Sequence, residues 1–302
     1  MKIGTKVCLF VLAVAAELLL LSPPGDVGAG GNPNDGVQIG VVKSMFRDAP
    51  PSMINILSRP LQALMVSETG MTGKLEVAAD AFTLGQQLKD RKVQLGVFHG
   101  FEFAWARQKN PGLEPLVIAV CKHRLLHANL VVRKENPCTG CTALEGKVLA
   151  LARLSREHCH LFLERRCPGE GRDPHKFFSK ITTPSDAEEA LDDVVDGTAQ
   201  ATIVDHIALD AYRACKPARS ERLRVLKQSE GFPAAVVAYQ PGALDEATLR
   251  RFRDGMIGAN KTERGKALLK LCRISGFEAV PDDYSRALEE IARAYPPVPT
   301  RK

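Results

Sequence analysis

Short apolar runs alternate with amphipathic segments along most of the chain. Runs that predict buried strands or strand-like extended segments cover residues 37–42, 74–78, 93–98, 116–121, 129–134, 144–151, 199–205, 223–228 and 234–239. Apolar positions at helical spacing, or a helical composition, predict helices over residues 53–66, 83–90, 101–108, 157–166, 187–195 and 207–213. Pro60 interrupts the first of these helices. This alternation predicts an α/β fold with mostly parallel sheets.

The C-terminal part of the chain has a different pattern. Residues 245–294 are predicted to be mostly helical, with breaks at Gly276 and Pro281. Two sets of alternating strands and helices, followed by a helical end, predict two lobes.

The first 29 residues have the pattern of a secretory signal peptide. Lys2 and Lys6 precede an apolar stretch, residues 7–21, and small residues around Ala29 suit cleavage. A membrane anchor is the alternative, but Glu17 interrupts the stretch, which is shorter than the roughly 20 residues that a spanning helix needs. Residues 30–36 predict a flexible tether. We therefore expect a periplasmic or extracytoplasmic protein with no membrane span after cleavage.

Charge and aromatic content argue against a nucleic-acid partner. The 41 basic and 35 acidic residues give a net charge of only +6, and aromatic residues make up 6% of the chain. A nucleic-acid-binding surface would show a basic stripe with aromatic residues for base stacking, and the sequence has no long basic block.

Cysteines allow disulfides if the protein is exported. Cys8 lies in the predicted signal peptide, which leaves seven of the eight cysteines. Cys138 with Cys141, and Cys159 with Cys167, could each close a short loop, and the odd number leaves at least one thiol over. A redox-active Cys138–Cys141 pair is disfavoured, because a loop follows it rather than the start of a helix.

Several segments in order carry a family resemblance. The quoted segments are LEGKVLAL (144–151), ALDDVVDGTAQATIVD (190–205), LRVLKQSEGFP (223–233) and GFEAVPDDY (276–284). In order and spacing, the mature chain resembles the periplasmic phosphate, phosphite and phosphonate-binding proteins of ABC transporters. The resemblance implies a type II periplasmic binding fold, in which two α/β lobes joined by two crossover segments close on a ligand.

The resemblance also implies a division of the chain and a function. Lobe 1 would comprise residues 37–128 and 232–302, and lobe 2 residues 129–231, with the outgoing crossover near 129–134 and the return near 227–234. The implied function is the capture of a small anion of the phosphate or phosphonate class for an ABC transporter permease. A monomer without catalysis, cofactor or bound metal is expected. The alternative is a metal-binding or sensory protein on the same fold.

The candidate ligand-binding residues surround the start of the helix predicted at residue 157. Relatives carry Ser-Thr-Ser-Gly there, whereas this chain has Arg156, Glu157, His158 and Cys159, so only the preceding Ser155 offers a hydroxyl. Ser155 is also expected to cap the helix. Arg153 and Arg156 could pair with an oxyanion and His158 could donate a proton, whereas Glu157 would repel an anion. Further candidates at strand ends and helix starts are Phe46, His99, Ser185, Asp205 and His206.

Three other interpretations of this region stay open at the level of sequence. Arg156 and Glu157 could be a solvated ion pair in a lost pocket. His99, His158, Asp205 and His206 could line one cleft and hold Zn²⁺ or Cu²⁺, although His158 and His160 are two residues apart and point in different directions on a helix. Cys159 with a histidine and Asp205 could catalyse a reaction, but no GxSxG, HExxH or P-loop motif occurs.

Overall fold

The computed structural model describes residues 36–47, 49, 53, 54, 56, 58–169 and 172–297. The chain divides into Met1–Asp35 and Gly36–Lys302, and the predicted signal peptide and nearly all of the predicted tether lie outside the described residues. None of the helices in the described residues is both long enough and apolar enough to cross a membrane.

A six-stranded sheet forms the core of the first lobe. Its strand order is β13-β4-β12-β3-β1-β2, with β1 (Val37–Val42), β2 (Gly73–Ala78), β3 (Leu95–Phe98), β4 (Glu114–Val120), β12 (Ala235–Tyr239) and β13 (Gly276–Glu278). Strands β1 to β4 run in one direction, and β12 and β13 run in the other.

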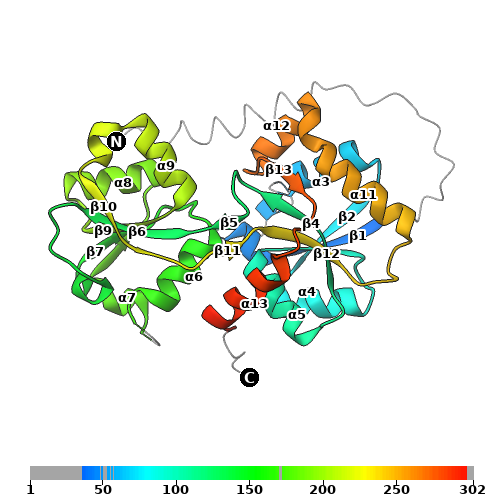
Figure 1. The fold of residues 1–302 in the computed structure, drawn as a ribbon, viewed down its shortest axis with the longest axis horizontal. Helices are drawn as coiled ribbons and strands as arrows, with labels where there is room; N and C mark the ends of the chain where they lie inside the picture. The colour runs from blue at the N-terminus through cyan, green and yellow to red at the C-terminus, as the bar shows by residue number, and fades with distance from the viewer. Residues whose placement is uncertain are drawn as a thin grey trace. The chain divides into compact units, whose positions relative to one another are not determined.

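Helices cover both faces of this sheet, and each face has its own apolar core (Figure 1). One face packs against α4 (Ala81–Lys89), α5 (Gly100–Lys109) and α13 (Tyr284–Ala294), and the other against α3 (Arg59–Thr69), α11 (Glu246–Gly258) and α12 (Glu263–Leu271). The 3-10 turns η1 (Lys43–Phe46) and η3 (Ala259–Lys261) complete this lobe.

A five-stranded sheet forms the core of the second lobe. Its order is β10-β6-β9-β7-β8, with β6 (Ala128–Arg133), β7 (Val148–Ala150), β8 (Lys180–Thr182), β9 (Ala201–Asp205) and β10 (Leu223–Gln228). Only β6 runs against the other four strands. One face packs against α6 (Glu157–Arg166) and α7 (Pro174–Phe177), and the other against α8 (Ala187–Asp196) and α9 (His206–Cys215), followed by α10 (Pro217–Ser220).

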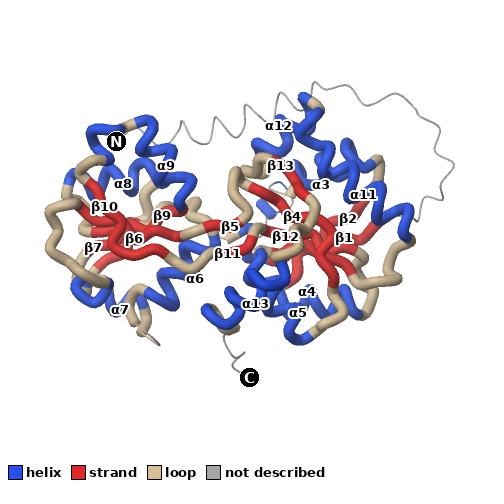
Figure 2. Tube along the Cα trace, in the orientation of Figure 1, coloured by secondary structure: helices blue, strands red, loops and turns tan. Residues whose placement is uncertain are grey.

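Two connections join the lobes and pair with each other. β5 (Leu125–Leu126) and β11 (Phe232–Pro233) form a two-stranded antiparallel sheet between the two large ones (Figure 2). The predicted return connection, 227–234, includes β11. The predicted outgoing connection, 129–134, was wrong, because residues 129–133 are part of β6 in the second sheet.

The predicted α/β fold with mostly parallel sheets is confirmed, since four of six and four of five strands share one direction. The helix predicted over residues 53–66 is interrupted as expected, although two residues before Pro60: residues 53, 54 and 56 are helical, Ser58 is in a turn, and α3 begins at Arg59. Proline has no N–H group, and the first turn of a helix does not need one, so Pro60 fits the start of this helix. The lobe boundaries stay a prediction.

Gly100, the first residue of α5, lies against the backbone of the return connection. A Cβ atom there would be 2.3 Å from the carbonyl oxygen of Pro233 and 2.7 Å from that of Ala234. Backbone cannot move aside as a flexible side chain can, so Gly100→Ala is expected to lower the free energy of unfolding by about 2–3 kcal/mol. Denaturant unfolding measures this loss.

Gly140→Ala is the matched control. Gly140 has extended backbone, and a Cβ atom there would have nothing within 4 Å. Its unfolding free energy should stay within about 0.5 kcal/mol of the original value. Equal losses in the two variants would contradict the proposed steric conflict at Gly100.

Candidate functional site

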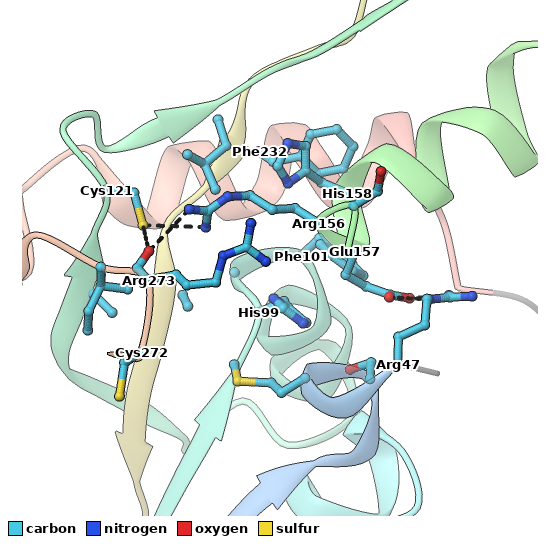
Figure 3. A pocket seen from close by; sticks show the side chains of 18 of the residues that line it. Arg47, His99, Phe101, Cys121, Arg156, Glu157, His158, Phe232, Cys272 and Arg273 are labelled. Carbon is cyan, nitrogen blue, oxygen red and sulfur yellow. Dashed lines mark hydrogen bonds and ion pairs between the residues drawn. The ribbon is translucent and has the colours of Figure 1, made fainter. Parts of the chain in front are cut away.

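A cavity of about 260 Å³ lies between the two lobes (Figure 3). In the first lobe, the lining residues come from η1 and the residue after it, the start of α5, the end of β4 and the turn before β13. They are Ser44, Met45, Arg47, His99, Gly100, Phe101, Ala119, Cys121, Cys272, Arg273 and Ile274. The second lobe contributes residues 153–158 between β7 and α6, and the connections contribute Leu126, Phe232, Pro233 and Ala235. The cavity thus lies where β1, β3 and β7 end and where α5 and α6 begin, the usual ligand position in such sheets.

The N-cap of helix α6 lies one residue later than expected. Its range, Glu157–Arg166, matches the prediction, but its N-cap is Arg156 and not Ser155. The backbone N–H of Ser155 donates to the carbonyl of Ala152, which makes a turn before the helix starts. The first-turn N–H groups of Glu157 and His158 have no partner within the helix, so they are donors at the cavity wall.

The guanidinium of Arg156 bridges the two lobes. Its Nε lies 2.7 Å from Oδ2 of Asp205, Nη1 donates to Sγ of Cys121 at 3.4 Å, and Nη2 donates to the carbonyl oxygen of Arg273 at 3.1 Å. Burial disfavours its charge, but interactions with Cys121 and Asp205 outweigh burial and raise its pKa. The Nε, Nη1 and Nη2 atoms of Arg156 therefore all donate to protein groups.

Glu157 is paired with an arginine of the other lobe. Both of its carboxylate oxygens accept hydrogen bonds from the guanidinium of Arg47, which follows η1. Arg47 also lies 3.9 Å from Glu164, about two turns further along α6. The negative charge that was expected to repel an anion is thus largely neutralised by Arg47.

Two histidines that line the cavity pack against aromatic rings. His99 stacks on Phe101, with ring centroids 5.7 Å apart, and His158 packs on Phe232 at 5.4 Å. Burial lowers the pKa of His99 to about 4 and lowers that of His158 as well, so both are neutral at pH 7. Their Nε2 atoms have no hydrogen-bond partner among the described residues.

The carboxyl group of Glu102 is buried and contacts Ser44, which lines the cavity. Glu102 of α5 is 7% exposed, and both of its oxygens lie 2.8 Å from the hydroxyl of Ser44. Burial raises the pKa of Glu102 to about 7. The contact ties the end of β1 to α5, and it places a group that titrates near neutrality next to the cavity lining.

Glu102 and the two histidines should have opposite effects on stability as the pH changes. The folded-state pKa of Glu102 is raised from 4.5 to about 7, so its contribution is lost as the pH rises through that window. The pKa of His99 is lowered from 6.5 to about 4, so its contribution is lost as the pH falls through that window. Glu102→Gln removes only the first effect. Between pH 4.5 and 7, the free energy of unfolding of this variant should therefore increase relative to that of the original protein by about 1.4 kcal/mol for each unit that the pH rises.

Denaturant unfolding at several pH values between 4.5 and 7 measures this difference. Glu114→Gln serves as the control, because Glu114 is exposed at the edge of β4 and far from Ser44 in the fold. Parallel stability curves for Glu102→Gln and the original protein would rule out a raised pKa at Glu102.

The structure brings six of the ten predicted site residues to the cavity. They are Arg153, Ser155, Arg156, Glu157, His158 and His99. Phe46 does not line it, because its ring packs against the apolar core on the α3 side of the first sheet. Ser185 does not line it either, because its N–H and hydroxyl both donate to the carboxylate of Glu189 at the start of α8.

Asp205 and His206 also lie outside the cavity lining. Asp205 stands behind Arg156 and caps α9, with Oδ1 accepting from the N–H of Ala208 at 2.7 Å. His206 lines a second cavity of about 440 Å³ together with His127. The residues of the metal hypothesis are therefore not gathered in one place, and the described residues contain no group of three or more His, Cys, Asp or Glu side chains that could hold a metal ion.

Sequence reasoning missed the first-lobe residues that face α6. Arg47 directly follows the predicted Phe46, and the end of β1 was a usable signal for it. Arg273 had no such signal, because it lies in a turn before β13 with a φ of 58°. Its Nη1 donates to the carbonyl of Leu154 at 3.2 Å, and its guanidinium lies beside that of Arg156 (Figure 3). Burial and the neighbouring charge of Arg156 lower its pKa.

Comparisons with known proteins agree on one family and one fold. The family model of the periplasmic substrate-binding protein of phosphonate ABC transporters matches residues 46–284. No curated protein matches the sequence.

Among solved structures, this chain is similar to XAC2383 from Xanthomonas citri bound to ATP, with 18% identity, a TM-score of 0.57, and 86% of this chain and 99% of that one covered. It is similar to PhnD1 from Prochlorococcus marinus in complex with methylphosphonate, with 13% identity, a TM-score of 0.54 and coverage of 85% and 97%. It is also similar to PA3383 from Pseudomonas aeruginosa, a binding protein component of an ABC phosphonate transporter, with 16% identity, a TM-score of 0.52 and coverage of 85% and 86%. At these identities the likenesses bear on the fold.

Proposed function

Because the chain belongs to the family of periplasmic substrate-binding proteins of phosphonate ABC transporters, we propose that it binds a small oxyanion of the phosphonate or phosphate class between its lobes. The family resemblance and the type II binding fold inferred from sequence are confirmed. Membership implies a small-molecule ligand, a transporter permease as partner and a periplasmic location. The family is one of solute-binding proteins and is not typically enzymatic, and we propose no catalysis.

The charge balance of the cavity supports an anionic ligand. Four arginines and one glutamate line it: Arg47, Arg153, Arg156, Arg273 and Glu157. Glu157 is paired with Arg47, and Arg156 with Asp205. Among the described residues, the side chain of Arg153 has no hydrogen-bond or ion-pair partner, and Arg273 donates only to Leu154. This excess of positive charge is the observation that carries the proposal.

The start of α6 adds the donors that an oxyanion needs. The unpaired N–H groups of its first turn and the positive end of the helix dipole attract an anion, as helix N-termini do generally. Ser155 adds a hydroxyl, and Arg153 and Arg273 can each donate two parallel hydrogen bonds to one oxyanion. The neutral His99 and His158 can supply an N–H or a lone pair, which a singly protonated phosphonate matches with oxygens of both kinds.

The size of the cavity limits the ligand. Its volume of about 260 Å³ corresponds to several water molecules, at roughly 30 Å³ each in the liquid. It suits a compact anion of a few heavy atoms and lies below the range of roughly 300–1,000 Å³ that is typical of drug-sized ligands.

A thermal-shift screen tests the proposal. Phosphate, phosphite, methylphosphonate, sulfate and acetate are titrated separately, with Zn²⁺ and Cu²⁺ as further arms. One oxyanion is expected to raise the melting temperature in a concentration-dependent way, because a ligand that binds only the folded state stabilises it by mass action. If no anion shifts the melting temperature and Zn²⁺ or Cu²⁺ does, the proposed function is wrong.

The remaining parts of the proposal concern the chain as a whole. We propose an export signal at residues 1–29, a tether at 30–36, and lobes of 37–128 with 232–302 and of 129–231, in a monomeric mature protein. N-terminal sequencing of the exported protein should begin at Gly30, and size-exclusion chromatography with light scattering should give the monomer mass. A retained N-terminus or a stable dimer would count against these assignments.

A further inference from the structure

Two thiols in the second lobe are in direct contact. Sγ of Cys167, the C-cap of α6, lies 3.8 Å from Sγ of Cys141, the first residue of η2 (Cys141–Leu144). Both side chains are buried: Cys141 is 9% exposed and Cys167 is 0% exposed. A disulfide has a sulfur separation of about 2.05 Å, so the two sulfur atoms have to approach each other by less than 2 Å to bond. We propose that Cys141 and Cys167 form a disulfide in the exported protein, an assignment that rests on the predicted export.

None of the other cysteines among the described residues is placed to form a disulfide with Cys141 or Cys167. Cys159 and Cys167 are eight residues apart along α6, about 12 Å along its axis, so the structure rules out this one of the possible pairings. Cys138 contacts the carbonyl oxygen of Ala143 at 3.5 Å, so it points to its own loop. Cys215 is exposed on α9, and Cys121 and Cys272 belong to the first lobe, where they line the cavity between the lobes.

The surroundings of the pair favour thiol–disulfide exchange. A hydrogen bond from Cys167 lowers the pKa of the Cys141 thiol to about 7 against the effect of burial, and the charge of Lys227 assists. The same hydrogen bond and burial raise the pKa of Cys167. Once folding has brought the two thiols into contact, Cys141 is therefore the sulfur that ionises first and attacks, because the thiolate is the nucleophile in such exchange.

The reaction needs an organic disulfide as oxidant. The Cys141 thiolate attacks one sulfur of the oxidant, breaks its S–S bond and releases one thiolate, which leaves a mixed disulfide. Cys167 then loses its proton and attacks Sγ of Cys141, which forms the protein disulfide and releases the second thiolate. Two protein thiols are oxidised, and one organic disulfide is reduced to two thiols. Since both sulfurs are buried in the folded protein, the reaction should accompany folding.

The cross-link would anchor the helix that carries the site. Cys167 ends α6, and the other end of α6 presents Arg156, Glu157 and His158 to the cavity. A bond between Cys141 and Cys167 closes a loop of 26 residues and should raise the melting temperature by about 5–10 °C.

Peptide mapping of the full chain tests the assignment. The protein is refolded with reduced and oxidised glutathione, free thiols are alkylated, and trypsin digestion is performed without reduction. Trypsin separates the relevant cysteines into residues 135–147 (Cys138 and Cys141), residues 157–165 (Cys159) and a peptide that begins at Cys167. The peptide 135–147 should be linked to the Cys167 peptide until reduction, whereas Cys159 should be alkylated.

Two variants distinguish Cys141 from its neighbour. Cys138→Ser should keep the linked peptide and a melting temperature that falls on reduction, and Cys141→Ser should lose both. Alkylated Cys167 in the oxidised original protein, a link to Cys159, or a link that survives Cys141→Ser but not Cys138→Ser would each overturn the proposal. The mapping needs no ligand or permease, so its failure and a failure of the proposed function are separate results.

Discussion

Arg273→Gln is expected to weaken oxyanion binding by about 10- to 100-fold. Arg273 lines the cavity, and its guanidinium donates to the protein only through Nη1, to the carbonyl of Leu154. Hydrogen bonds to charged groups contribute about 1.5–3 kcal/mol, and each 1.4 kcal/mol corresponds to a factor of ten in affinity. Isothermal titration calorimetry with the anion identified in the thermal-shift screen measures the loss.

Arg286→Gln is the matched control for this experiment. It makes the same change in net charge on an exposed face of α13, outside the cavity lining. Its affinity should stay within about twofold of the original, since long-range effects of exposed charges are screened by salt. An unchanged affinity in Arg273→Gln, or equal losses in the two variants, would place the anion elsewhere.

Arg156→Ala is expected to lower the free energy of unfolding by about 3 kcal/mol. The substitution leaves the carboxylate of Asp205, a residue that is 8% exposed, without its cation, and it removes the bridge to Cys121 and the carbonyl of Arg273. Removal of one partner of a buried ion pair costs about 3–5 kcal/mol, and the partial exposure of Arg156 places the effect at the low end. Denaturant unfolding gives the value directly.

A double-mutant cycle with Asp205→Asn tests the physical reason. Asparagine keeps an oxygen for the N–H of Ala208 and removes the charge that Arg156 compensates. The double variant should therefore be more stable than the sum of the two single losses predicts, by about 1 kcal/mol or more. Additive losses would mean that Arg156 stabilises the protein through its contacts in the first lobe instead.

Local sequence patterns were sufficient where one element carried its own signal. The range of α6 follows from a polar start, apolar positions at helical spacing and basic residues in the last turn, and the structure has the same bounds. The connections were harder, because β5 and β11 have only two residues each and therefore no periodicity to detect. The family resemblance placed the outgoing connection near residues 129–134, and no local pattern at β5 was available to correct it.

The site divides in the same way. Arg153 and residues 155–158 were predicted because the family resemblance places a ligand-binding motif where β7 leads into α6, and these two ends are neighbours in sequence as well as in space. Their partners come from far along the chain: Arg47 is 110 residues from Glu157, and Arg273 is 117 residues from Arg156. The cysteines show the reverse error, since nearness in sequence suggested Cys159 for Cys167, whereas folding brings Cys141 to it.

In its pairing with Arg47, the carboxylate of Glu157 occupies a guanidinium that a bound anion could otherwise contact. A carboxylate fixed on α6 is present at a high effective concentration, since it cannot diffuse away from the arginine that faces it. An incoming oxyanion can displace it from Arg47 or bind beside it, and displacement subtracts the free energy of that ion pair from the affinity. If an oxyanion binds in this cavity by displacing Glu157, one with two negative charges should compete for Arg47 better than one with a single charge, because Coulomb attraction grows with charge.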